Sequence, residues 1–169
     1  MRTTTRCVLI LGFALVSARG SSAQSTRETV NIVVTGGKTA GKFEATGMKG
    51  GCTAGKEGAN TWGNSLNLKD GNPTDLSFLE LQLPDAKAAA GGAMQFLLVV
   101  GFGPTKPRSP EYTVDTRPDS KKPSGKGTVT VKDKGTTAIV TFKVETADGV
   151  KIDGTIDCKR VARTIPLGG

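Results

Sequence analysis

The absence of histidine sets the first limit on the chemistry of this 169-residue chain. Without an imidazole there can be no Ser-His-Asp triad, Cys-His pair, histidine proton shuttle or histidine-ligated metal site. An enzyme of this composition would need paired carboxylates, a lysine base or a metal held by oxygen ligands. The side chains that remain for chemistry are the cysteines, the carboxylates and the cations.

The cysteines of the mature chain are better explained by a disulfide than by catalysis. Cys52 lies among glycines in G-G-C-T-A-G (50–55), where a nucleophile could be exposed, but only lysines are candidates to activate its thiol. Cys158 closes the run G-T-I-D-C, and two such cysteines normally pair in an oxidising compartment. We predict a Cys52–Cys158 disulfide that closes a loop of about 100 residues and contributes roughly 4–5 kcal/mol.

Two turn-like motifs offer weaker possibilities. K-D-G-N-P-T-D (69–75) supplies Asp70, Asn72 and Asp75 as oxygen ligands, but it lacks the ligand spacing and terminal Glu of a calcium loop. It predicts a surface turn, with a calcium site as the alternative. V-V-T-G-G-K-T (33–39) predicts a hairpin turn, because Ile32 stands where a phosphate-binding loop requires glycine. We expect no cofactor.

The positive charge of the chain, +8 overall, is concentrated in two segments. The segment 103–127 contains Lys106, Arg108, Arg117, Lys121, Lys122 and Lys126, and the C-terminal tail adds Lys159, Arg160 and Arg163. Both could meet a polyanion, and both could instead be ordinary solvated surface. Trp62 is a further candidate for ligand contact, as a sugar platform or an interface anchor, with burial in the core as the alternative.

The first 23 residues have the order of a secretory signal peptide. Arg2 and Arg6 precede the apolar run 7–16, and small residues follow it, so cleavage after Ala18 or Ala23 would fit. The run is too short to span a bilayer, and we expect no membrane span once the signal is removed. The sequence thus predicts a secreted or periplasmic protein whose residues 24–169 form one domain.

The remaining chain predicts an all-β fold. Short alternating runs separated by turn residues indicate an antiparallel β-sandwich, or a barrel-like variant, of about eight or nine strands. The expected strands are 28–35, 42–48, 65–69, 76–83, 94–102, 111–115, 128–132, 137–146 and 150–160. A short helix is expected over 84–90, a Pro-rich basic loop with one edge strand over 103–127, and a flexible tail over 161–169.

The last three strands predict a meander whose register can be argued residue by residue. A two-residue loop would place Val144 against Asp153 and mix the two faces, whereas a loop over 147–149 pairs Val144 with Ile152. That register pairs Phe142 with Gly154, Val140 with Ile156, Ala138 with Cys158, Lys143 with Asp153, Glu145 with Lys151, and Thr141 with Thr155. For the preceding hairpin, a tight turn at 134–135 predicts Val131 beside Ala138, Val129 beside Val140 and Gly127 beside Phe142.

Three features of the chain are similar to small actinobacterial lipoprotein antigens. They are the two distant cysteines, the D-G-N-P turn before L-S-F-L-E-L (76–81), and the ending G-T-I-D-C (154–158). That family is anchored by a lipid on a cysteine after its signal, and this chain has no cysteine there. The resemblance therefore implies no function for it.

Together these features predict a non-catalytic exported β-sandwich that binds a partner or serves a structural role. The alternatives are an exported enzyme with a histidine-free carboxylate or lysine site, and a polyanion or glycan binder acting through 103–127 and the tail. An envelope protein or an anionic polymer would be the partner, and the oligomeric state stays open.

Overall fold

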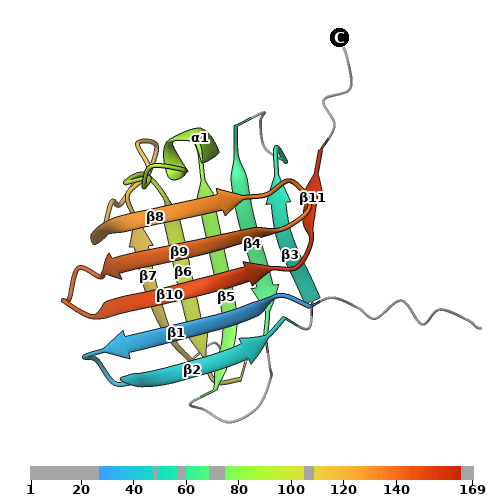
Figure 1. Cartoon of the computed structure of the whole chain (residues 1–169). Helices are drawn as coiled ribbons and strands as arrows, with labels where there is room; N and C mark the ends of the chain where they lie inside the picture. The colour runs from blue at the N-terminus through green and yellow to red at the C-terminus, as the bar shows by residue number, and fades with distance from the viewer. Residues whose placement is uncertain (1–26, 48, 57–59, 69–74, 105–108, 165–169) are drawn as a thin grey trace, which may run out of the picture.

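The computed structural model describes residues 27–47, 49–56, 60–68, 75–104 and 109–164. They form two sheets packed face to face, which confirms the β-sandwich (Figure 1). The five-stranded sheet has the order β2–β1–β10–β9–β8, formed by β1 (Thr29–Thr35), β2 (Gly41–Thr46), β8 (Lys126–Asp133), β9 (Ala138–Glu145) and β10 (Lys151–Cys158). The six-stranded sheet has the order β11–β3–β4–β5–β6–β7, formed by β3 (Lys49–Ala54), β4 (Trp62–Asn67), β5 (Leu76–Leu83), β6 (Leu97–Phe102), β7 (Ser109–Asp115) and β11 (Val161–Arg163).

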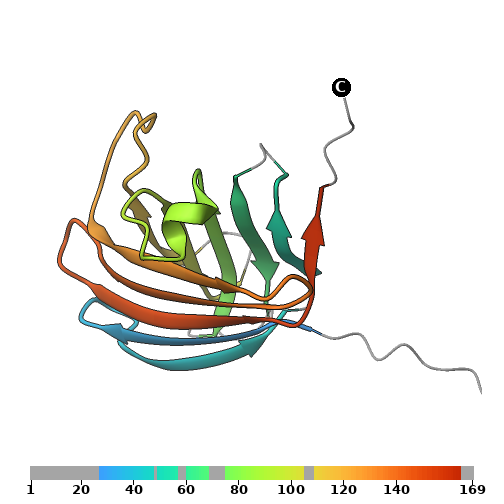
Figure 2. The ribbon, with the colours of Figure 1, turned by 45° about the horizontal axis from the view of Figure 1, so that its top comes forward.

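The strands of one sheet run across those of the other, and the five-stranded sheet curves against its partner (Figures 1 and 2). Apolar and polar side chains alternate along the strands, so each sheet has one apolar face, and these two faces pack against each other in the interior. The largest fully buried side chains come from both sheets and include Ile32, Leu66, Leu81, Phe96, Phe102 and Phe142. The sandwich therefore has one core between its two layers.

One short helix, α1 (Ala86–Ala89), lies within the predicted range 84–90. The Asp85 carboxylate caps it by accepting hydrogen bonds from the backbone N–H groups of Lys87 at 2.9 Å and Ala88 at 3.2 Å. Ala89 is fully buried, and the backbone of Ala93 then bridges to Val129 of β8. No helix in the described part of the chain is long and apolar enough to span a bilayer.

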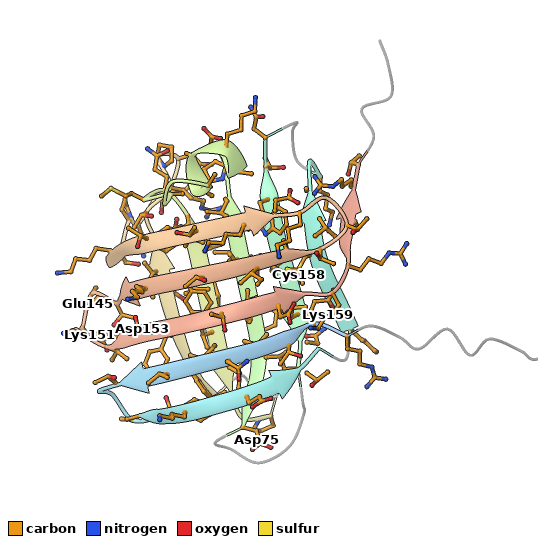
Figure 3. The ribbon with its side chains drawn as sticks, viewed as in Figure 1. Asp75, Glu145, Lys151, Asp153, Cys158 and Lys159 are labelled. Carbon is orange, nitrogen blue, oxygen red and sulfur yellow. A yellow bond between two sulfur atoms is a disulfide. The ribbon has the colours of Figure 1, made fainter. Side chains whose placement is uncertain are left out.

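The β9–β10 hairpin confirms its predicted register in full. Val144 pairs with Ile152, Phe142 with Gly154, Val140 with Ile156 and Ala138 with Cys158, while Lys143–Asp153, Glu145–Lys151 and Thr141–Thr155 pair on the outer face. The three-residue loop is closed by the N–H of Thr146, which donates to Val150 O at 2.9 Å, and Gly149 has φ +83°. Figure 3 shows Glu145, Lys151 and Asp153 near this turn and Cys158 at the opposite end of β10.

The predicted register of the β8–β9 hairpin is wrong by two residues. Val131 pairs with Val140, Val129 with Phe142 and Gly127 with Val144. The turn is still tight but lies one residue further along the chain, because the N–H of Lys134 donates to Thr137 O and leaves Gly135 and Thr136 at the tip, while Asp133 accepts from the Gly135 N–H. A shift of two residues keeps every side chain on its own face, so the apolar alternation could not detect the error.

Two strands went unrecognised because their residues resemble loops. β3 is rich in glycine, and β11 falls within the segment predicted to be a flexible tail. β11 pairs parallel with β3, placing Val161 opposite Cys52. Arg163 fixes its far end by donating from Nη2 to Asp133 Oδ2 at 2.7 Å and from Nε to Gly135 O at 2.9 Å.

The ends of the other strands lie closer to the ranges that the sequence predicts. β4 begins at Trp62 rather than at residue 65, and β6 begins at Leu97 because Met94 lies in an exposed turn. Within β6, inward Leu98 and outward Val99 are both buried, as expected for a strand covered on both faces. β7 is the edge strand predicted within 103–127.

The Cys52–Cys158 disulfide is present and joins the two sheets. Cys52 lies on β3 and Cys158 on β10, their Cα atoms are 6.0 Å apart, and both residues are buried. The bond closes a loop with a sequence separation of 106 residues. It therefore links the first strand of the six-stranded sheet in the chain to the last strand of the five-stranded sheet.

The aromatic ring of Phe142 covers Gly154 and leaves no room for a side chain at that position. A Cβ at this position would lie 2.3 Å from Cζ of Phe142 and 3.0 Å from the backbone O of Asn31. We expect Gly154→Ala to lower the free energy of unfolding by about 1–3 kcal/mol, because the buried ring cannot move without repacking. Urea denaturation measures this.

The matched control is Gly91→Ala, where the nearest atom to a new Cβ is 3.8 Å away, and its stability should stay close to that of the parent. Adding Phe142→Leu to Gly154→Ala should recover part of the loss. Equal stability of Gly154→Ala and Gly91→Ala would contradict the packing argument.

Loss of the disulfide should cost much of the stability of the domain. We expect the double variant Cys52→Ala, Cys158→Ala to lose roughly 4–5 kcal/mol in free energy of unfolding, because its unfolded chain is no longer constrained. Fluorescence of the single tryptophan, Trp62, reports the transition. Reduced parent protein should unfold at the same urea concentration as the variant, and an unchanged midpoint in both would refute the stabilising role.

Candidate functional site

Trp62 is a core residue, not an exposed platform. Its side chain is 2 % exposed, and Nε1 donates to Oδ1 of Asn64 at 2.9 Å. The Asn64 amide in turn donates to Sγ of Cys52 and contacts Sγ of Cys158 at 3.5 Å. Trp62 therefore belongs to a buried polar group packed around the disulfide, and no ligand can stack on its ring from outside.

The basic residues predicted as ligand contacts have different surroundings. Lys106 and Arg108 lie outside the described residues. Lys121 and Lys122 are exposed in the loop after β7, and Lys126 lies 3.5 Å from the Glu145 carboxylate. Of the basic residues in this segment that the structure describes, Arg117 and Lys126 lie within ion-pair distance of carboxylates, and Lys121 and Lys122 form no ion pair with the described residues.

The weak calcium candidate is only partly visible. Asp70 and Asn72 lie outside the described residues, and Asp75 lies at the start of the segment leading into β5 (Figure 3). Among the described residues, no group of three or more His, Cys, Asp or Glu side chains could hold a metal ion.

Arg117 is held in an internal network. Nε and Nη2 donate to the two carboxylate oxygens of Asp115, each at 3.0 Å, and Nη1 donates to Oε1 of Gln82 at 2.7 Å. Ser120 Oγ also donates to Asp115 at 2.9 Å, and Gln82 Nε2 donates to Glu80 at 2.6 Å. The hydrogen bonds from Arg117 hold the pKa of Asp115 below its usual value, although partial burial opposes the shift.

A groove crosses the outer face of the six-stranded sheet over β3, β4 and β5, and we call it the β3–β5 groove. Its volume is about 670 Å³. Cys52 and Asn64 point inward, so their neighbours along the strands point outward. Gly51 pairs with Ser65, Thr53 with Gly63, and Ala162 with Thr53, so over β11, β3 and the middle of β4 the floor has no side chain larger than threonine, and Asn67, Glu80 and Gln82 border it.

This floor is open because of its glycines. A Cβ on Gly63 would meet Oγ1 of Thr53 at 3.4 Å and Leu81 O at 3.6 Å, and neither contact disturbs the fold. The space above Gly63 is therefore available to a ligand. Thr53, Ser65, Asn67 and Gln82 supply hydroxyl and amide groups along the groove.

Three cations border the β3–β5 groove. Arg27, Lys56 and Arg160 are exposed, and none of them forms an ion pair within the described residues. The carboxylate of Glu80 already accepts the hydrogen bond from Gln82. A smaller hollow of about 160 Å³ continues the groove past Lys56 and Gln82 to Arg117 and Asp119. Positive charge thus lies on the rim of the groove without a partner in the described chain.

Glu28 lies at one end of the groove and is 7 % exposed. Its carboxylate forms no hydrogen bond or ion pair with the described residues, and Oε1 lies 3.6 Å from the position of a Cβ on Gly51. Every fully enclosed side-chain oxygen or nitrogen among those residues has a partner, so the Glu28 oxygens must keep some access to the groove. The Glu28 carboxylate is therefore a hydrogen-bond acceptor open to the groove, on a residue that is otherwise nearly buried.

Sequence reasoning missed most of this site. Arg160 was recognised as part of the basic tail, but Arg27, Glu28 and Lys56 stood in no motif. The sequence did contain one signal, because small residues alternate at 51 and 53 and again at 63 and 65. These four positions lie on the outer face of two adjacent strands. Recognising it required β3 to be identified as a strand.

No protein-family model matches the chain, and comparisons with curated proteins and with solved structures also find no match.

The Asp115–Arg117 pair predicts a pH-dependent contribution to stability. Because the folded pKa of Asp115 is lowered, its contribution is fully present above the unfolded pKa of about 3.9 and is lost as the pH falls below that value and through the lower folded pKa. We expect Arg117→Gln to reduce the free energy of unfolding by about 1–3 kcal/mol near neutral pH and by less at acid pH, once Asp115 is protonated in the folded protein. Urea unfolding at both pH values tests this.

The control is Lys121→Gln, an exposed cation in the same loop, which should change stability little at either pH. A loss for Arg117→Gln that is equal at neutral and acid pH would show that packing, and not the charge pair, carries the effect.

Proposed function

We propose that this chain is an exported, non-catalytic binding module that takes an anionic ligand into the β3–β5 groove. The observation that carries the proposal is the set of three cations without ion pairs, Arg27, Lys56 and Arg160, around a floor of small residues. Cations arranged along a groove attract ligands of opposite charge, and the hydroxyl and amide groups can then fix their orientation.

Several features support export and a non-catalytic role. The N-terminal segment has the order of a signal peptide, and a buried disulfide suits an oxidising compartment. The chain has no histidine, and the perturbed carboxylate Asp115 is fully engaged with Arg117 and Ser120. These features favour binding over acid–base catalysis.

The proposed ligand is an anionic polymer, and the cations of the groove should dominate its binding. We expect the exported protein to bind dextran sulfate with an affinity that falls steeply between about 20 and 300 mM NaCl, as exposed charges are screened. The triple variant Arg27→Gln, Lys56→Gln, Arg160→Gln should bind at least about tenfold more weakly by calorimetry.

The matched control removes three lysines elsewhere, Lys42→Gln, Lys132→Gln and Lys134→Gln, and changes the net charge by the same amount. It should retain most of the affinity. Equal losses in the two triple variants would show that binding follows overall charge and would overturn the groove as the site.

A groove-filling variant tests the location without changing charge. Gly63→Val places methyl groups over the floor, where the nearest atoms leave room for a Cβ. We expect its urea midpoint to stay near that of the parent while dextran sulfate binding weakens at least about tenfold. Undiminished binding by a folded Gly63→Val protein would place the ligand elsewhere.

A further inference from the structure

We propose that the ligand of the β3–β5 groove is a polyuronate, an acidic glycan whose sugars carry both a carboxylate and free hydroxyl groups. This inference rests on the proposed function and names its ligand class. In it, Arg27 and Arg160 pair with ligand carboxylates, and Glu28 accepts hydrogen bonds from the hydroxyl groups of a neighbouring sugar.

The negative charge of Glu28 favours polyuronates over polyanions that carry no hydroxyl groups. A ligand that presents only negative charge, such as a sulfated or phosphorylated chain without hydroxyl donors, would be repelled by a carboxylate inside the groove. Glu28 is nearly buried, has no partner in the described chain and adjoins the Gly51 end of the floor. A ligand that brings hydrogen-bond donors to Glu28 as well as negative charge to the arginines therefore fits this end of the groove better than a purely anionic one.

The rest of the groove agrees with a hydroxylated ligand. Thr53 and Ser65 face outward beside the glycines, and Asn67 adds an amide that can both donate and accept. The glycine floor lets a sugar ring approach the backbone closely. No aromatic side chain lines the groove among the described residues, so stacked nucleobases have no platform there.

Arg160 and Glu28 adjoin the Gly51 end of the groove, because Val161 pairs with Cys52 and Glu28 lies beside Gly51. Arg27 and Glu28 are adjacent in the chain, immediately before β1, and Arg160 lies between β10 and β11. Arginine pairs with a carboxylate through two parallel hydrogen bonds, so each arginine can hold and orient one uronate carboxylate. A polyuronate repeats a carboxylate and hydroxyl groups on every sugar, so adjacent sugars of one chain can supply the carboxylates for the arginines and the hydroxyl groups for Glu28.

The experiment compares two probes, polygalacturonate and dextran sulfate, with the exported protein and its Glu28→Gln variant. We expect Glu28→Gln to weaken polygalacturonate binding at least about tenfold, because a charged acceptor for hydroxyl groups is lost. The same change should leave dextran sulfate binding unchanged or stronger, since a repulsive charge is removed. Urea unfolding of the variant should show that the fold is kept.

Glu44→Gln is the matched control, because Glu44 is an exposed carboxylate on β2 of the other sheet. It should leave binding of both probes unchanged. If Glu28→Gln changes the two affinities in the same direction, or if polygalacturonate binds no better than uncharged dextran, the polyuronate inference is overturned. The proposed function would stand if the triple variant Arg27→Gln, Lys56→Gln, Arg160→Gln still bound dextran sulfate more weakly than the parent. If the triple variant bound dextran sulfate as well as the parent, both the proposed function and the polyuronate inference would be overturned.

Discussion

The disulfide between β3 and β10 is the constraint on which the rest of this structure depends. It joins the two layers at one corner, where the chain leaves β10 and, after two residues, enters β11 beside β3 (Figures 1 and 3). Few interactions other than core packing hold orthogonal layers together, and this bond fixes their relative position covalently. Asn64 and Trp62 pack around it, so the polar groups of the corner remain paired.

The candidate site is the outer side of the same corner. Cys52 and Asn64 point inward to the disulfide, so the residues between and beside them must point outward and form the floor of the groove. β11 extends that floor by one strand through Ala162, and Arg160 is held at its rim by the short connection from Cys158. The bond that closes the sandwich thereby positions the charges that we assign to ligand binding.

The sequence predicted the parts of the fold that local patterns control. The register of β9–β10 followed from alternation, turn chemistry and opposed charges, and the disulfide followed from two cysteines outside an N-terminal segment with the residue order of a signal peptide. The β8–β9 register failed because alternation cannot separate registers two residues apart. β3, β11 and the groove escaped prediction because glycine-rich residues gain strand structure only from their neighbours, and because Glu28 and Arg160 become adjacent only through the topology.

The most direct test of the account is to map a bound oligogalacturonate by the backbone amide resonances of the isotopically labelled protein. The account predicts that the perturbed resonances gather at Glu28, Gly51, Thr53, Gly63 and Ser65, on the outer face beside the disulfide. Perturbations confined to the outer face of the five-stranded sheet, around Asn31 and Thr155, or to the loop after β7, would contradict it.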